Sequence, residues 1–83
     1  MADFSKDSAE FKMFADYYNL TKRWYDGVKT IKEYDIFTTE INGFTAKYKN
    51  GKCGVLARKM ALALNNYIDE LYYAYKETLM RKG

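Results

Sequence analysis

Few residues of this chain could take part in covalent or metal chemistry. The sequence contains no histidine and a single cysteine, Cys53, so it offers neither a Ser-His nor a Cys-His pair for nucleophilic catalysis. A metal site of the His/Cys kind is excluded for the same reason. Its only serines, Ser5 and Ser8, lie in the expected N-terminal arm and at the start of the first helix. We therefore expect a non-enzymatic protein without cofactor or metal.

Cys53 has two interpretations. Basic residues surround it in the sequence, and positive charge lowers the pKa of a thiol and makes it more reactive. A lone cysteine is far more often a small buried apolar residue, and this is the interpretation that we favour.

The charged residues point to binding instead. Between Ile41 and Ile68 the chain has five basic residues and no acidic residue, although its net charge is only +3. Such a segment could contact a phosphate backbone, and a tyrosine within it could stack on a base. The alternative is that lysines on edge strands discourage aggregation. The predicted nucleic-acid or anion-binding residues are Lys47, Tyr48, Lys49, Lys52, Arg58 and Lys59.

A long helix over Leu56–Leu79 is expected to position part of this segment. Apolar residues recur along it at the spacing of a helix that buries one face, and neither glycine nor proline interrupts it. Its opposite side has a second line of residues that includes three large apolar ones. The interpretations are scattered surface residues or a strip for protein contact, and the candidate contact residues are Leu62, Tyr73 and Met80.

A first helix is predicted from Asp7 or Ser8 to about Asp26, where Gly27 offers a stop. Its apolar residues cover an arc of about 180°, whereas packing on one surface needs little more than about 100°. We therefore expect one flank of this helix to contact another chain, and the predicted interface residues are Met13, Tyr17, Leu20 and Trp24. The following segment, 28–34, could be helix or connector.

From Asp35 onward, β-branched and aromatic residues dominate, and two Asn-Gly pairs follow at positions 42–43 and 50–51. Asn-Gly between strand-like runs is a strong signal for a hairpin. The pattern predicts strands over 35–41 and 44–49 and a short third strand over 52–55. The expected fold is α+β: a helix, a small antiparallel sheet of two or three strands, and the long C-terminal helix.

Over residues 35–64, this order of elements resembles a double-stranded-RNA-binding domain. The likeness consists of a basic turn followed by Arg58 and Lys59 at the start of an alanine-rich helix. The Pro- and His-containing loop of that family is absent, and Asn42-Gly43 stands in its place. The minor-groove contact that the loop would supply is therefore missing, and we do not assign the chain to the family.

Three functions remain open. The first is a protein-binding module that docks on a larger partner, because the chain is rich in tyrosine, a residue suited to interfaces. In size and in its lack of catalytic residues it resembles phage-encoded inhibitors of host defence or nucleic-acid-processing complexes, such as anti-CRISPR proteins. The second is an RNA- or DNA-binding module, and the third is an oligomer that sequesters a small anionic ligand.

We expect a single domain over 1–83 with a flexible arm over 1–6. Neither a signal peptide nor a membrane span is evident, so the expected location is the cytoplasm, that of a host cell if the protein is encoded by a phage. A homodimer is the favoured oligomer, because so small a chain gains stability from association.

Overall fold

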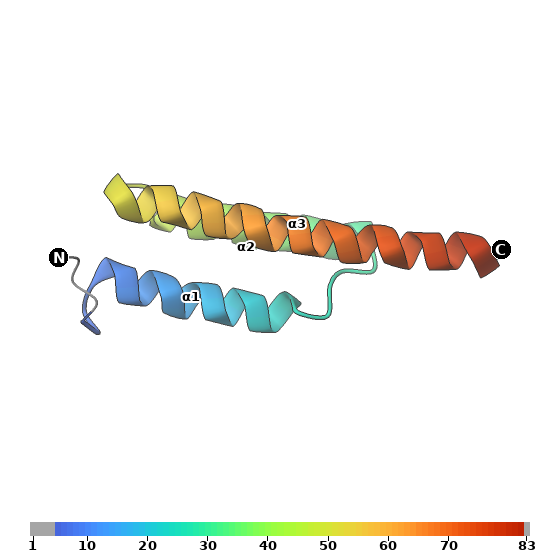
Figure 1. The fold of residues 1–83 in the computed structure, drawn as a ribbon, viewed down its shortest axis with the longest axis horizontal. Helices are drawn as coiled ribbons and strands as arrows, with labels where there is room; N and C mark the ends of the chain where they lie inside the picture. The colour runs from blue at the N-terminus through green and yellow to red at the C-terminus, as the bar shows by residue number, and fades with distance from the viewer. Residues whose placement is uncertain (1–4, 83) are drawn as a thin grey trace.

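The computed structural model describes residues 5–82 as three helices that form one antiparallel bundle: α1 (Ala9–Trp24), α2 (Ile31–Lys47) and α3 (Gly51–Lys82). In Figure 1, α1 and α3 run in the same direction, and α2 runs in the opposite direction behind α3. The molecule is elongated, with extents of 55 × 17 × 17 Å. Most of the arm predicted for residues 1–6, namely residues 1–4, lies outside the described residues.

The predicted α+β fold is wrong, because residues 5–82 contain no strand. The segment 34–48 is helical to Lys47, and its large apolar residues recur every three or four positions. These residues are Tyr34, Phe37, Ile41, Phe44 and Tyr48, and all except Tyr34 are buried in the common core. Burial of this stripe outweighs the strand preference of the β-branched residues, which amounts to only a few tenths of a kcal/mol for each residue.

Local hydrogen bonds also support α2. Thr30 caps its N-terminus by accepting a hydrogen bond from the backbone N–H of Glu33 at 3.0 Å, and the Glu33 carboxylate accepts one from the backbone N–H of Lys29 at 2.8 Å. The hydroxyl of Thr39 donates to the carbonyl of Asp35 at 3.0 Å, so this polar group has a partner inside the helix, although such a bond does not itself stabilise a helix. The pair Asn42-Gly43, predicted to form a hairpin turn, lies inside this helix.

The second Asn-Gly pair forms a turn, but the turn joins two helices. Gly51 has a φ of +61°, a conformation that glycine adopts without strain, and α3 begins at this residue. Gly54 packs against the end of the preceding segment, since a Cβ atom there would lie 2.4 Å from the carbonyl oxygen of Lys49. The predicted third strand over 52–55 is therefore the first turn of α3, and the resemblance to a double-stranded-RNA-binding domain does not extend to the fold.

The first helix is close to its prediction. Ser8 is its N-cap and accepts a hydrogen bond from the backbone N–H of Phe11 at 3.1 Å. The helix ends at Trp24, and Gly27 turns the chain at a φ of +85°, close to the side chain of Leu71. The segment 28–34 is divided, because it is a connector as far as Thr30 and helix from Ile31.

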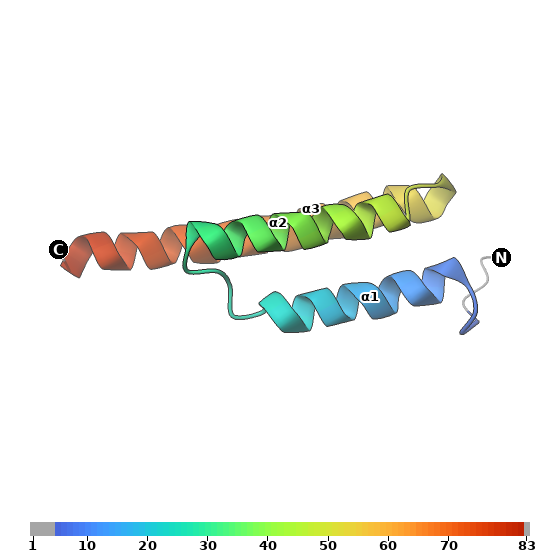
Figure 2. The ribbon, with the colours of Figure 1, turned by 180° about the vertical axis from the view of Figure 1, so that it is seen from behind.

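The C-terminal helix is confirmed and is longer than predicted, with 32 residues. Its last turns extend past α1 and past the start of α2 (Figures 1 and 2). Ile31 and Tyr34, at the start of α2, line a pocket of about 220 Å³ with Tyr72 and Lys76 of α3. Beyond Lys76, Leu79 and Met80 are exposed. None of the helices in the described part of the chain is both long and apolar enough to cross a membrane.

Candidate functional site

The outer surface of the bundle has three long faces, one along each pair of helices. We call the face along α1 and α2 the ion-paired seam, the face along α2 and α3 the cationic groove, and the face along α1 and α3 the aromatic face. The residues predicted to bind partners are distributed over the ion-paired seam, the cationic groove, other parts of α3 and the core. Each face has a different chemistry, and the differences decide which of them is available to a partner.

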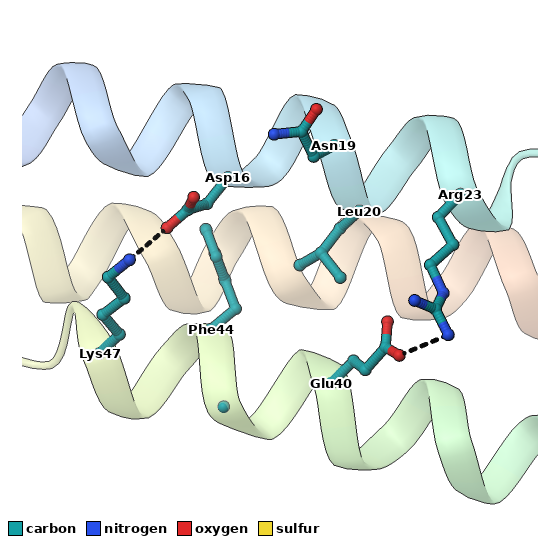
Figure 3. A pocket seen from close by; sticks show the side chains of 8 residues that line it. Asp16, Asn19, Leu20, Arg23, Glu40, Phe44 and Lys47 are labelled. Carbon is teal, nitrogen blue, oxygen red and sulfur yellow. Dashed lines mark hydrogen bonds and ion pairs between the residues drawn. The ribbon is translucent and has the colours of Figure 1, made fainter.

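Four charged residues line the ion-paired seam, and all of them are paired across the two helices. Lys47 Nζ lies 2.9 Å from Asp16 Oδ2, and Arg23 lies 2.9 Å from Glu40 Oε2. Figure 3 shows the two pairs at either end of a pocket of about 380 Å³, with Leu20 and Phe44 between them. These charges join α1 to α2, so the seam has a structural role.

Two residues of the predicted basic site belong to this seam. The Tyr48 hydroxyl donates to Asp16 Oδ2 at 2.5 Å, and the Tyr48 ring is buried, with 6% of the residue exposed. Burial alone would raise the pKa of Asp16, but the hydrogen bonds from Lys47 and Tyr48 and the charge of Lys47 outweigh it and lower that pKa. Tyr48 is therefore not placed to stack on a base, and the charge of Lys47 is already paired with the carboxylate of Asp16.

A further carboxylate of the seam holds an aromatic residue in place. Glu40 accepts a hydrogen bond from the indole N–H of Trp24 at 2.9 Å, in addition to its ion pair with Arg23. Trp24 packs edge-on against Phe37 of α2 inside the core. Because buried polar groups are costly without a partner, this bond fixes the orientation of the indole ring.

The cationic groove has a different charge pattern. It has a volume of about 470 Å³, and its only charged lining residues are Lys49 and Arg58, both exposed. Neither forms an ion pair with any residue in the described range. The remaining lining is apolar or neutral, with side chains that include Asn42, Leu62 and Asn65. This groove suits an anion that carries an apolar part.

The other two residues of the predicted basic site lie elsewhere. Lys52 and Lys59 are seven residues apart on α3, so they share one side of that helix, whereas Arg58 points about 100° away from Lys59. Both lysines are exposed. The structure therefore does not bring the six predicted residues together on one surface. The predicted hairpin would have grouped them, but the helix distributes them around its axis.

The aromatic face has the largest group of exposed rings. Phe11, Phe14, Tyr18 and Tyr25 follow one another at helical spacing along one line that runs the length of α1 to its C-cap, and their exposed fractions are 43, 45, 65 and 63%. The line borders α3 at its C-terminal end, where Tyr25 stacks on Tyr67 with ring centroids 6.0 Å apart and the Tyr67 hydroxyl donates to the Tyr25 carbonyl.

Residues of α3 continue the aromatic face. Leu56 lies eleven residues before Tyr67, hence on the same side of the helix, and is 40% exposed. Met60 lies seven residues before Tyr67 and is partly buried against the core. Lys22 lies over the ring of Tyr18 at 5.4 Å, a cation–π contact at the edge of the face. Apolar side chains of both α1 and α3 thus belong to this face.

The predicted interface residues of α1 lie on the opposite flank from this face. Met13 and Trp24 are buried in the core, with 0 and 7% exposed, and Tyr17 and Leu20 pack against it. On α3, the predicted Leu62, Tyr73 and Met80 are exposed. The broad apolar arc of the first helix indicated surplus apolar surface but did not identify which flank faces the core. The exposed line of α1 was therefore missed.

The thiol of Cys53 and the hydroxyl of Tyr34 both have partners within the fold. Burial and the nearby Glu10 raise the pKa of the Cys53 thiol, which lies 3.5 Å from the sulfur of Met13, so the interpretation as an activated thiol is wrong. The Tyr34 hydroxyl donates to Asp69, and this bond, together with burial, raises the pKa of Tyr34 to about 12.

No protein-family model matches the chain, and no curated protein or solved structure with which it was compared matches it either.

Proposed function

We propose that this chain is a non-enzymatic protein-binding module whose docking surface is the aromatic face. The observation that carries the proposal is the exposed line of α1, in which Phe11, Tyr18 and Tyr25 together with Phe14 present their rings to solvent. Large exposed apolar patches are uncommon on monomeric proteins and mark sites of interaction. Aromatic residues are also the residues most enriched at protein interfaces.

The chemistry of the face supports a protein partner. Tyr18 and Tyr25 combine an apolar ring with a hydroxyl group that can remain hydrated at the edge of an interface. The ion-paired seam is less suited to docking, because a partner would have to separate or desolvate four charges that are already paired. The expected role as a phage-type inhibitor of a larger complex, such as an anti-CRISPR protein, would use the same binding mode and remains a proposal.

A pair of matched variants tests the docking surface. Phe11→Ser with Tyr18→Ser removes two rings of the aromatic face, whereas Leu62→Ser with Tyr73→Ser removes two exposed apolar side chains elsewhere on the molecule. After chemical cross-linking, the first variant is expected to lose protein adducts that the wild type and the second variant retain. Circular dichroism confirms that both variants are helical. Loss of adducts in the second variant alone would refute the proposal.

A second candidate function rests on the cationic groove. Lys49 and Arg58 are exposed, lack an ion pair in the described part of the chain, and line a groove without an acidic residue. This arrangement favours a ligand with a phosphate or carboxylate group, which includes RNA, DNA and small organic anions. Two cations on this surface would make few contacts with a phosphate backbone, which favours a small anion over a long nucleic acid.

Titration against labelled RNA and DNA tests this second function. Binding through Lys49 and Arg58 is expected to weaken between about 50 and 200 mM salt and to disappear in Lys49→Glu with Arg58→Glu. Lys12→Glu with Lys32→Glu, which reverses two exposed charges outside the groove, serves as the control. Equal loss in both variants would show an effect of net charge and would exclude a specific site.

A further inference from the structure

We infer that the aromatic face is occupied by α3 of a second copy of this chain. The two α3 helices would run antiparallel, related by a two-fold axis that crosses them at the level of the peptide bond between Leu64 and Asn65. The inference rests on the proposed function, because the docking surface is the same, and it identifies the partner. A larger partner would then meet the dimer. Three features of α3 and α1 carry the inference.

The first feature is a line of charges on α3. Lys52, Lys59, Glu70 and Glu77 are separated by 7, 11 and 7 residues, so they lie along one side of the helix. All four are exposed, and none forms an ion pair with another residue in the described range. Two bases are followed by two acids, which leaves this line with a basic end and an acidic end.

The spacing of these charges makes the line complementary to itself. The pair Lys52 and Glu77 and the pair Lys59 and Glu70 have the same midpoint, between Leu64 and Asn65. A two-fold axis at that point places Lys52 opposite the partner's Glu77 and Lys59 opposite the partner's Glu70, and symmetry repeats both contacts. A parallel arrangement would place like charges together, so the charges select the antiparallel one.

The second feature is the apolar row beside these charges. Leu56, Ala63 and Ala74 are exposed and share one side of α3, next to α1. The midpoint between Leu56 and Ala74 along α3 is Asn65, which is close to the midpoint of the two charged pairs. The same axis therefore brings Leu56 of each copy to Ala74 of the other, where the small side chain permits close approach of the helices. From Lys52 to Glu77 the contact extends about 37 Å along the helix.

The third feature is the position of α1 along α3. The Met13–Cys53 and Tyr25–Tyr67 contacts place each residue of α1 beside the residue about 41 positions later in α3. In its own copy α1 therefore covers only the first part of α3, and the end of α3 extends beyond the bundle (Figure 2). The two-fold axis places the α1 helix of the second copy alongside the part of α3 that α1 of the first copy leaves uncovered. The exposed rings of each α1 then face α3 of the other copy.

Reversal of charge tests the inference. The acidic variant, Lys52→Glu with Lys59→Glu, and the basic variant, Glu70→Lys with Glu77→Lys, each place like charges at all four contacts. The wild type is expected to have twice the chain mass of 9.8 kDa by light scattering, and each variant alone to associate at least about tenfold more weakly. An equimolar mixture of the two variants restores opposite charges at every contact and is expected to form a heterodimer.

Lys12→Glu with Lys32→Glu has the same net charge as the acidic variant and is expected to remain dimeric. The inference is overturned if the wild type is monomeric at the highest attainable concentration, if either variant associates as strongly as the wild type, or if the mixture does not recover. A monomeric wild type whose Phe11→Ser/Tyr18→Ser variant loses adducts with another protein would retain the proposed function and exclude the second copy. A dimer disrupted only by Leu62→Ser with Tyr73→Ser would refute both.

Discussion

At the scale of single residues, the fold uses carboxylates to hold aromatic side chains of other helices. Glu40 of α2 binds the indole of Trp24, Asp16 of α1 binds the hydroxyl of Tyr48 at the end of α2, and Asp69 of α3 binds that of Tyr34. The apolar rings stabilise the bundle wherever they are buried, but these bonds fix their orientation and the alignment of the helices. These carboxylates are therefore bonded within the fold and not free to bind a ligand.

Removal of the Glu40 carboxylate is expected to destabilise the protein more than removal of its ion-pair partner. Glu40→Ala leaves the indole N–H of Trp24 without its partner in a nearly buried position, at an expected cost of about 1–3 kcal/mol. Arg23→Ala removes an exposed ion pair, worth about 0–1 kcal/mol, and an exposed cation–π contact with the Trp24 ring, worth about 0.5–1 kcal/mol, but it leaves the indole hydrogen bond intact. Urea denaturation followed by Trp24 fluorescence measures both. Equal effects would contradict the assigned role of the indole bond.

The raised pKa of Tyr34 predicts a loss of stability in alkaline solution. Since the pKa is about 10 in the unfolded chain and about 12 in the fold, the protonated hydroxyl stabilises the folded state below about pH 10, and this contribution disappears as the pH rises toward 12. Tyr34→Phe should lower the melting temperature at pH 8, and the difference from wild type should narrow between pH 10 and 12. A difference independent of pH would be contrary to this expectation.

At the scale of elements, the sequence predicted the two amphipathic helices and failed on the third. The apolar spacing of α3 and the Ser8 cap and Gly27 stop of α1 are local signals that the tertiary structure reinforces. In α2 the local signals conflict, because Thr and Ile residues and Asn42-Gly43 favour a hairpin. The recurrence of Phe37, Ile41 and Phe44 favours a helix. Burial of that stripe against two neighbouring helices decided the outcome, and the stripe was the signal that could have revealed α2.

Two glycine substitutions distinguish the helical structure from the predicted hairpin. Gly43 lies in the interior of α2 with open space around it, so Gly43→Ala should stabilise the protein by about 1 kcal/mol. In a hairpin turn, which needs a positive φ, the same change would be destabilising. Gly54→Ala should cost about 1–3 kcal/mol, because its Cβ would meet the Lys49 carbonyl. Thermal denaturation is expected to show a higher melting temperature for Gly43→Ala and a lower one for Gly54→Ala than for the wild type.

At the scale of the whole molecule, the arrangement of faces follows from the helical α2. A hairpin would have gathered Lys47, Lys49 and Lys52 with Arg58. The bundle instead pairs Lys47 with Asp16, leaves Lys49 and Arg58 together in the cationic groove, and places Lys52 on another side of α3. The sequence correctly indicated that the first helix has more apolar surface than one core requires. It could not indicate which flank is exposed, because that depends on where α2 and α3 pack.

The most direct test of the central claim, that the aromatic face is the docking surface, is site-specific photocross-linking. A benzophenone amino acid replaces Tyr18 on that face or, in the matched protein, Leu62 on another exposed surface. The account predicts that the probe at position 18 forms a protein adduct, mapped by mass spectrometry to α3 of a second copy, and that the probe at position 62 forms none. Adducts from position 62 alone, or from neither position, would contradict it.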